Sequence, residues 1–392
     1  MTVSKGEPLR ILVVVHDFQP GGTERIALRL ASRWADDGDE VAVACGNTTG
    51  PLKSLVSAKV ELFVPANPIR RSLFSRIAVA RFAARSARAF KPDVIFLPGN
   101  FHAVMAVILK PALGRRCPAI VVKGSNLLRR AKRGRAGEAA FMAQLTIITA
   151  FADHLVAMSP ELLDEARRSL PWKAARYTVV PEPVLADLPA VSPRHAEAGD
   201  DPPLLVAAGR LAAQKNFAVL LDAAAQLDRP FNLIIYGEGP QRAKLEASIK
   251  SLGLTERVTL AGYIDDLMPA LSHARLFVMS SDYEGFPAVL IEALAAGVPV
   301  VTTDCSPAIA GIVAMADGIL VPTGDPAALA GAIRASLDQP APDRRRLAAS
   351  VDRFRIGPSA AAYRDLFGKL ASNRLRATAN HRGGIDRDAR DA

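Results

Sequence analysis

Short apolar runs alternate with helical patterns along nearly the whole chain, and this alternation limits the possible folds more than any other feature. In the first half we predict strands near residues 10–15, 41–45, 60–63, 93–97, 119–123 and 154–158. A second series is predicted near residues 204–208, 231–236, 257–260, 276–279, 299–302 and 318–321. Helices fill the gaps, for example over 24–35 and 75–90. Strands that alternate with helices are typical of an α/β fold with mostly parallel sheets.

A proline-rich segment separates the two series of strands. Residues 181–203 contain six prolines, and proline interrupts helices and strands because its φ is fixed and it has no amide donor. The length of 392 residues also suits two domains. We therefore predict an N-terminal α/β domain over 1–182, a linker over 183–203 and a C-terminal α/β domain over 204–357.

The region after the second domain divides in two. A helix is expected over about 358–371, packed back on the N-terminal domain. Residues 372–392 are polar and charged and lack a hydrophobic period, so we expect a disordered tail.

Composition excludes several classes of protein. Half of the residues are hydrophobic and 22% are charged, which excludes wholesale disorder. Cys45, Cys117 and Cys305 lie far apart and form neither a zinc ligand set nor a disulfide framework, so a reducing compartment is expected. The apolar run at 11–15 is too short for a signal peptide, and no stretch has the roughly 20 apolar residues of a membrane span. We expect a cytoplasmic protein, soluble or peripheral to a membrane.

Positive charge is concentrated in the first half of the chain. The formal net charge is +10, and residues 1–190 carry 27 Lys and Arg against 16 Asp and Glu, whereas residues 191–392 carry 22 against 23. Within residues 66–135, sixteen basic residues accompany one acid, Asp93. This imbalance indicates an anionic partner for the first half.

A glycine pair follows the first predicted strand and opens a helix. Gly21 and Gly22 allow close approach of a ligand to the backbone, and free amides at a helix start attract anions. The alternative is an ordinary turn from strand to helix in which Thr23 is the N-cap residue.

Two cations follow the first strand of the second half. Arg210 and Lys215 come directly after a strand and Gly209, where a planar fork and a point charge suit a diphosphate. The segment is neither a Walker loop nor a dinucleotide fingerprint. The alternative is that both are solvated loop charges.

The most specific segment is Ser-Ser-Asp-Tyr-Glu-Gly-Phe-Pro-Ala-Val-Leu-Ile-Glu at residues 280–292. Pro287 suits the first position of a helix, so we expect the amides of Ala288 and Val289 to be free to bind a phosphate. Glu284 and Glu292 could each accept hydrogen bonds from paired sugar hydroxyls. Alternatively, Glu284 favours the helix dipole and Glu292 is a solvated helix residue.

These motifs resemble a known family. The pairing of G-R-L-x-x-x-K-N with E-G-F-P-x-V-L-x-E-A-x-A-x-G-x-P-V-V is similar to the retaining family 4 glycosyltransferases, which have the GT-B fold of two Rossmann-like domains. The resemblance covers about residues 1–370. It implies transfer of a sugar from a UDP- or GDP-sugar with no cofactor and no metal, a nucleotide-sugar domain over 204–357 and an acceptor domain over 1–182.

The resemblance also implies residue roles. Gly21 and Gly22 would approach the donor phosphate and sugar, while Arg210 and Lys215 would neutralise the leaving diphosphate. Glu284 would contact the transferred sugar and thereby complete the catalytic set. The remaining residues expected to bind the donor through its ribose, base or phosphates are Glu292, Tyr263, Ile264, Gly285, Phe286, Pro287, Ala288 and Val289.

The chain departs from the family pattern in three places. Many members have a His just after the strand that ends here at Lys123, whereas this chain has Gly-Ser-Asn at 124–126. The segments Pro-Glu-Pro at 181–183 and Ser-Pro-Ala-Ile-Ala at 306–310 also differ from the common pattern. His102 follows a strand and could be an acceptor-side group, although a structural histidine is the alternative.

The basic first half suggests an anionic membrane as partner. Arg81, Arg85 and Arg88 share one helical face, and a second basic cluster occupies 129–135. Anionic lipid attracts such segments, and a lipid-linked or lipopolysaccharide acceptor would suit the same charge. Nucleic acid is disfavoured because the aromatic residues of 66–135 are all Phe. A solvated basic face is the plainest alternative.

The combined hypothesis is a metal-independent retaining glycosyltransferase of α-linkages at the cytoplasmic face of the membrane, acting in lipopolysaccharide, exopolysaccharide or capsule synthesis. Two alternatives remain open. One keeps the fold but changes the chemistry to a nucleotide-sugar epimerase or a glycan phosphorylase. The other is a non-catalytic basic protein that binds anionic lipid or nucleic acid.

Overall fold

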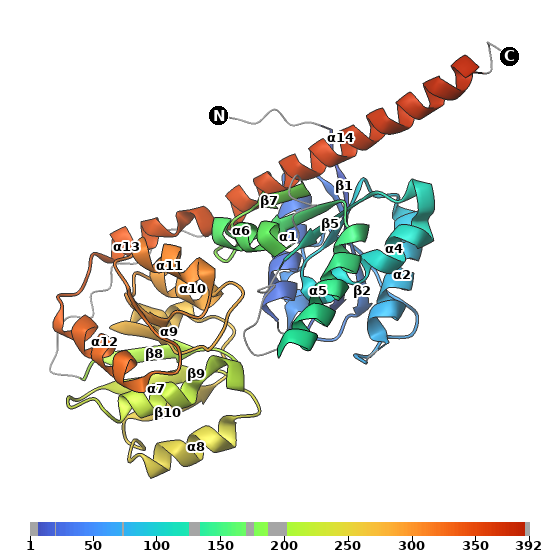
Figure 1. Ribbon diagram of the computed structural model, residues 1–392. Coiled ribbons are helices and arrows are strands. Elements are labelled where there is room, and N and C mark those ends of the chain that lie inside the picture. The colour runs from blue at the N-terminus through green and yellow to red at the C-terminus, as the bar shows by residue number, and fades with distance from the viewer. Residues whose placement is uncertain are drawn as a thin grey trace. The chain divides into compact units, whose positions relative to one another are not determined.

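The computed structural model describes residues 7–19, 21–72, 74–124, 134–169, 176–186 and 202–388. The chain forms two compact units (Figure 1). The first unit comprises Met1–Pro183 together with Ile356–Ala392, and the second comprises Val184–Arg355. Most of the predicted linker, residues 187–201, lies outside the described residues, as do residues 125–133, which include residues 129–133 of the second basic cluster.

The first unit is built on a parallel sheet of seven strands in the order β3-β2-β1-β4-β5-β6-β7. Its strands are β1 (Arg10–Asp17), β2 (Glu40–Asn47), β3 (Glu61–Phe63), β4 (Val94–Leu97), β5 (Ala119–Lys123), β6 (His154–Ala157) and β7 (Tyr177–Val179). Its helices are α1 (Gly22–Asp37), α2 (Ser75–Phe90), α3 (Asn100–Ala103), α4 (Ala106–Leu113), α5 (Gly134–Phe151), α6 (Pro160–Ser169) and α14 (Ile356–Asp388).

The second unit is built on a parallel sheet of six strands in the order β10-β9-β8-β11-β12-β13. Its strands are β8 (Leu204–Ala208), β9 (Asn232–Tyr236), β10 (Val258–Gly262), β11 (Leu276–Met279), β12 (Val300–Thr303) and β13 (Ile319–Val321). Its helices are α7 (Phe217–Ala224), α8 (Arg242–Ser251), α9 (Met268–Ser272), α10 (Ala288–Ala295), α11 (Pro307–Ala314), α12 (Pro326–Asp338) and α13 (Arg344–Ser350).

The predicted α/β class is confirmed, and each predicted strand overlaps an observed one. The reason is visible in β1, where all five residues from Ile11 to Val15 are fully buried. A strand covered by helices on both faces must be apolar throughout, so its sequence is a continuous apolar run. The prediction missed β7, whose three residues, Tyr177–Val179, form the edge of the sheet and are too short to give a periodic signal.

Helix α14 belongs to the first unit (Figure 1). An aromatic cluster holds it there. The ring of Tyr363 packs edge-on against Trp34 and Phe96, with centroids 5.9 and 5.2 Å away. The indole Nε1 of Trp34 donates a hydrogen bond to the carbonyl of Ala360 at 3.0 Å. The helix expected over 358–371 is part of α14.

The expected disordered tail over 372–392 was wrong for most of its length, because α14 continues to Asp388. The Arg-Leu-Arg-Ala run at residues 374–377 has high helix propensity, although Gly383 and Gly384 further along do not. Once the packed part of the helix has formed, each further residue adds a hydrogen bond without a new nucleation cost.

Within the described part of the chain, no helix is both long enough and apolar enough to span a membrane.

Candidate functional site

The candidate residues of the second unit lie where the strand order of its sheet reverses, between β8 and β11. Chain order runs outward from β8 through β9 to β10 on one side and from β11 onward on the other. Ligands of open α/β sheets bind beyond the carboxyl ends of the strands at such a reversal. Arg210 and Lys215 follow β8, and Glu284 follows β11, so the fold brings the three predicted catalytic residues to this point.

Lys215 and Glu284 form an ion pair, which the sequence did not predict. The Lys215 Nζ lies 2.7 Å from Glu284 Oε1. The hydroxyl of Ser281 donates to the same Oε1 at 2.7 Å, and the Glu284 amide donates to the Cys305 carbonyl at 2.9 Å. Glu284 is only 7% exposed. The carboxylate is therefore held by both side chain and backbone, while the ammonium has two further N–H donors for a ligand.

The loop that carries Arg210 depends on two glycines. Gly209 has φ +153°, and a Cβ atom there would lie 2.9 Å from the Cε of Lys215. At Gly237, φ is +145° and a Cβ atom would lie 1.9 Å from the Gly209 carbonyl oxygen. Any side chain at Gly237 would push this loop out of place. Arg210 itself is exposed and forms no ion pair with the residues that the structure describes.

The start of α10 differs from the prediction. Pro287 is the N-cap residue, and the first helical position is Ala288. The Ala288 amide donates to the Phe286 carbonyl at 3.0 Å, so it is not the free phosphate ligand that we expected. The cause is the backbone of Pro287, whose φ of −83° and ψ of 79° form an inverse γ-turn.

The other donor-site candidates have mixed environments. The Gly285 carbonyl accepts a hydrogen bond from the Ser306 hydroxyl at 3.0 Å, so the atypical 306–310 segment supports this loop. Tyr263, directly after β10, is 48% exposed, whereas Ile264 packs against the core. Glu292 lies on α10, half-buried; Phe286 packs against the core, and Val289 is partly buried beside it.

The glycine pair of the first unit lies at the start of α1. Gly21 is the N-cap residue, in an extended conformation, and Gly22 is the first helical residue and is exposed. The alternative in which Thr23 is the N-cap was wrong. A Cβ atom at Gly21 would lie 2.4 Å from a carboxylate oxygen of Glu24, so the missing side chain makes room for that carboxylate.

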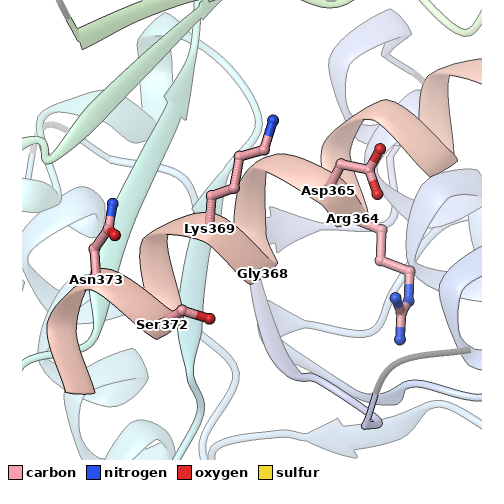
Figure 2. Close-up of a pocket in the computed structure, with 6 residues that line it drawn as sticks. All are labelled: Arg364, Asp365, Gly368, Lys369, Ser372 and Asn373. Carbon is pink, nitrogen blue, oxygen red and sulfur yellow. The ribbon is translucent and has the colours of Figure 1, made fainter. Parts of the chain in front are cut away.

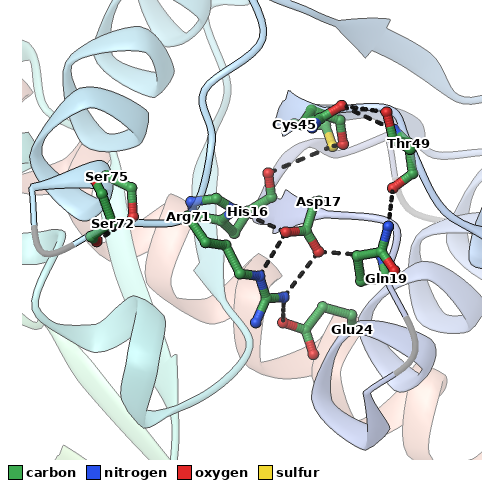
Figure 3. A network of polar contacts seen from close by, with 10 residues as sticks. His16, Asp17, Gln19, Glu24, Cys45, Thr49, Arg71, Ser72 and Ser75 are labelled. Carbon is green, nitrogen blue, oxygen red and sulfur yellow. Dashed lines mark hydrogen bonds and ion pairs between the residues drawn. The ribbon is translucent and has the colours of Figure 1, made fainter.

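A charged cluster beside this turn was missed by the sequence analysis (Figure 3). The guanidinium of Arg71 donates to both carboxylate oxygens of Asp17, at 2.6 and 2.8 Å, and lies 3.5 Å from Glu24. The Nδ1 of His16 lies 3.0 Å from Asp17. Asp17 ends β1, at the reversal between β1 and β4. Only the fold brings Arg71 to it, across 54 residues.

Burial and hydrogen bonding act on the carboxyl groups of this cluster in opposite directions. Burial tends to raise the pKa of Asp17, but hydrogen bonds from Arg71 and His16 outweigh it and hold the pKa well below its usual range. Burial is the main influence on Glu24 and raises its pKa. Asp17 is therefore a fixed anion, while Glu24 more readily takes up a proton.

Acidic pH should weaken the first unit through Asp17. A carboxyl whose pKa is lowered by folding stabilises the protein above its unfolded pKa, and this stabilisation is lost as the pH falls below about 4. We expect Asp17→Asn to have a lower Tm than wild type at neutral pH, with a difference that shrinks in acid. Thermal unfolding from about pH 7 to 3 measures this. A constant difference in Tm would contradict the proposed linkage.

His102 is fully buried in α3, and burial lowers its pKa to about 3. A neutral, buried imidazole has no exposed atom for an acceptor, so its environment favours the structural interpretation over the acceptor-side role.

The atypical Pro-Glu-Pro segment has a partner in the first unit. The Lys123 Nζ donates to both carboxylate oxygens of Glu182, at 2.6 and 2.8 Å. Lys123 is 1% exposed and Glu182 is 5% exposed. The hydroxyl of Ser359 on α14 donates to the adjacent Pro181 carbonyl at 2.7 Å. The segment after β7 is thus tied to both β5 and α14.

One hollow of about 520 Å³ lies along α14, and Figure 2 shows its lining. It is lined by Arg364, Asp365, Gly368, Lys369, Ser372 and Asn373. All come from a single helix, and none is a predicted site residue. Across the described ranges, no group of three or more His, Cys, Asp or Glu residues is placed to hold a metal ion.

Two family profiles match the chain. One, described as glycosyl transferases group 1, matches residues 192–352, and the other, a glycosyl transferase 4-like domain, matches residues 21–183. Together they span most of both units.

Similar proteins include two lipopolysaccharide core biosynthesis glycosyltransferases of Rhizobium meliloti. LpsD is 29% identical in a match that covers 56% of this chain and 65% of LpsD. LpsE is 38% identical in a match that covers 26% of this chain and 30% of LpsE. The matches thus span less than two thirds of these relatives. Among solved structures, Anabaena HepE with UDP and glucose has a TM-score of 0.74 at 18% identity, covering 92% of this chain and all of that one. Sucrose-phosphate synthase from Thermosynechococcus elongatus has a TM-score of 0.77 at 21% identity. The match covers 93% of this chain and all of that chain.

Proposed function

Because the chain belongs to the family 4 glycosyltransferases of the GT-B fold, we propose that it is a retaining glycosyltransferase that uses a UDP- or GDP-sugar. The observation that carries the proposal is the ion pair of Lys215 and Glu284 beyond β8 and β11, with the exposed Arg210 in the loop that follows β8. Cations beside a carboxylate suit a ligand with a diphosphate at one end and sugar hydroxyls at the other.

The chemistry follows from where charge develops. As the bond between the sugar and the diphosphate breaks, the acceptor oxygen bonds to the same carbon atom of the sugar. Negative charge accumulates on the leaving phosphate oxygens, one of which would take the proton of the acceptor hydroxyl. Arg210 is exposed and lacks an ion pair within the described residues, and Lys215 can turn from Glu284 toward the phosphates. Both would stabilise the leaving group without a metal ion. Glu284, still held by Ser281, would then accept hydrogen bonds from the transferred sugar, and Glu292 would hold the ribose.

For the acceptor we propose a lipid-linked or lipopolysaccharide glycan at the cytoplasmic face of the membrane. Two of the relatives are named for lipopolysaccharide core biosynthesis. The basic first half of the chain supports the same choice, since sixteen basic residues and one acid over 66–135 favour an anionic surface. The new linkage would be α, as expected for retention from an α-linked donor.

Nucleotide binding tests the donor site. We expect one of UDP, GDP and ADP, without metal, to raise the Tm of the wild type. A ligand at about a hundred times its Kd adds roughly 2.7 kcal/mol of stability. The Arg210→Ala/Lys215→Ala variant should lose this response, whereas Lys244→Ala/Lys250→Ala, which removes two exposed charges from α8 of the same unit, should keep it. An equal response in both variants would exclude the proposed diphosphate site.

A transfer assay separates the alternatives. Incubation of the nucleotide sugar with an acceptor glycan should release the nucleoside diphosphate, and NMR should identify an α-linked product. An excess of chelator should leave the rate unchanged. Conversion of the nucleotide sugar to its epimer without any acceptor would favour an epimerase instead.

A further inference from the structure

Helix α2 exposes an unusual stripe of side chains. Phe74, the residue before the helix, is 74% exposed, and Ile77 is 40% exposed. Arg81 and Arg85 follow on the same face, because positions three and four apart lie one above the other on a helix. The opposite face carries the buried residues Val79, Ala80, Ala83, Ala84, Ala87 and Phe90. We refer to Phe74, Ile77, Arg81 and Arg85 as the α2 stripe.

The charges of the α2 stripe are not neutralised locally. Arg81 and Arg85 form no ion pair with any residue that the structure describes. Arg88 is different, because its guanidinium donates to the Ala112 carbonyl at 2.6 Å. The single acid of residues 66–135, Asp93, accepts a hydrogen bond from the Arg10 amide at 2.8 Å. Two arginines are therefore available to an external anion.

The apolar end of the stripe begins beside the charged cluster of the first unit. The segment that leads into α2 is fixed to the carboxyl ends of two strands. The Ile69 amide donates to the Gly46 carbonyl of β2 at 2.8 Å, and Arg71 holds Asp17 of β1. Phe74 follows Arg71 by three residues. A surface bound by the stripe would therefore lie next to the end of the sheet where ligands bind.

We propose that the α2 stripe docks the first unit on an anionic lipid bilayer. Phe74 and Ile77 enter the boundary between headgroups and acyl chains, and Arg81 and Arg85 contact the headgroup phosphates. Apolar side chains beside arginines fit an interface that is apolar below and anionic above. A nucleic acid would not bury Ile77, which has no ring for base stacking. The benefit, access to a lipid-linked acceptor, rests on the proposed function, but the docking itself can be measured without sugar transfer.

Co-sedimentation with vesicles tests the docking. The full chain is mixed with vesicles of phosphatidylcholine alone or with added phosphatidylglycerol. We expect binding to the anionic vesicles only, weakened about 30-fold by Arg81→Ala/Arg85→Ala, since each arginine near an anionic surface contributes roughly a factor of 5. The matched control, Lys244→Ala/Lys250→Ala, removes the same charge from α8 and should bind like wild type. All variants change exposed side chains, so Tm should be unchanged.

Insertion of the apolar end has its own readout. In Phe74→Trp, indole fluorescence should shift to the blue on anionic vesicles and be quenched by lipids brominated in the acyl chain. Phe74→Ser/Ile77→Ser should weaken vesicle binding although its net charge is that of the wild type.

Equal losses in the α2 and α8 variants would overturn the proposal, because they would show a response to net charge alone. Tighter binding to single-stranded nucleic acid than to vesicles, with the same dependence on Arg81 and Arg85, would also overturn it. Nucleotide stabilisation of the second unit is independent of either result.

Discussion

Replacing Lys215 with alanine is expected to lower kcat for sugar transfer by about 10²–10³-fold, the usual cost of removing one group that stabilises transition-state charge. The ammonium lies 2.7 Å from Glu284 in the free protein and is proposed to move to the leaving diphosphate. Because that charge develops only as the bond breaks, kcat should fall more than the affinity for the acceptor. Steady-state release of the nucleoside diphosphate measures the effect.

Two further variants control for folding. Lys215→Ala leaves Glu284 buried without its cation, so part of any loss could come from a displaced loop. Arg210→Ala removes an exposed side chain that has no ion pair within the described residues, and it should lower kcat while Tm stays constant. Lys244→Ala on α8 should change neither. If Arg210→Ala and Lys215→Ala both keep wild-type kcat, the two cations have no role in the leaving-group chemistry.

Replacing Lys123 with methionine is expected to destabilise the first unit by about 3–5 kcal/mol, because it leaves a buried charge on Glu182 without its partner. Both side chains are almost fully buried, and the two hydrogen bonds between them measure 2.6 and 2.8 Å. Urea unfolding of the variant should show the loss as a lower midpoint. UDP or GDP binding to the second unit should persist under native conditions, since the pair lies wholly in the first unit.

The double variant Lys123→Met/Glu182→Leu should recover most of this stability, because a buried ion pair can often be replaced by apolar side chains at little cost. An exposed ion pair gives the matched control. Arg346 and Asp317 lie 2.7 Å apart with both side chains more than half exposed, and Arg346→Met should cost less than about 1 kcal/mol. If Lys123→Met costs no more than Arg346→Met, the buried pair does not stabilise the first unit as we infer.

The secondary structure could be predicted from the sequence because its signals are local. A strand such as β1 is buried on both faces, so its sequence is an unbroken apolar run, Ile11–Val15. The breaks between elements are equally local, as with Gly38, which ends α1 in the left-handed conformation. The local signal is weak in very short elements and at helix ends. The prediction therefore missed the three-residue strand β7 and placed Pro287 one position too far into α10.

The positions of Arg210, Lys215 and Glu284 after their strands also followed from the sequence, because parallel strands present their carboxyl ends at one edge. The partners of these and other charged residues did not. Lys215 pairs with Glu284, Lys123 with Glu182 and Arg71 with Asp17, across 69, 59 and 54 residues.

The sequence by itself therefore determined the α/β class, the strands other than β7, and the positions of Arg210, Lys215 and Glu284 after their strands. The tertiary structure alone decided which charges meet and which of them, like Lys123 and Glu182, are buried. The physical reason is the separation in sequence over which each signal acts. Strand and helix patterns arise between residues a few positions apart in the chain. The energy of an ion pair instead depends on the distance in space between the two charges and on their burial. Both are fixed only when remote segments pack together.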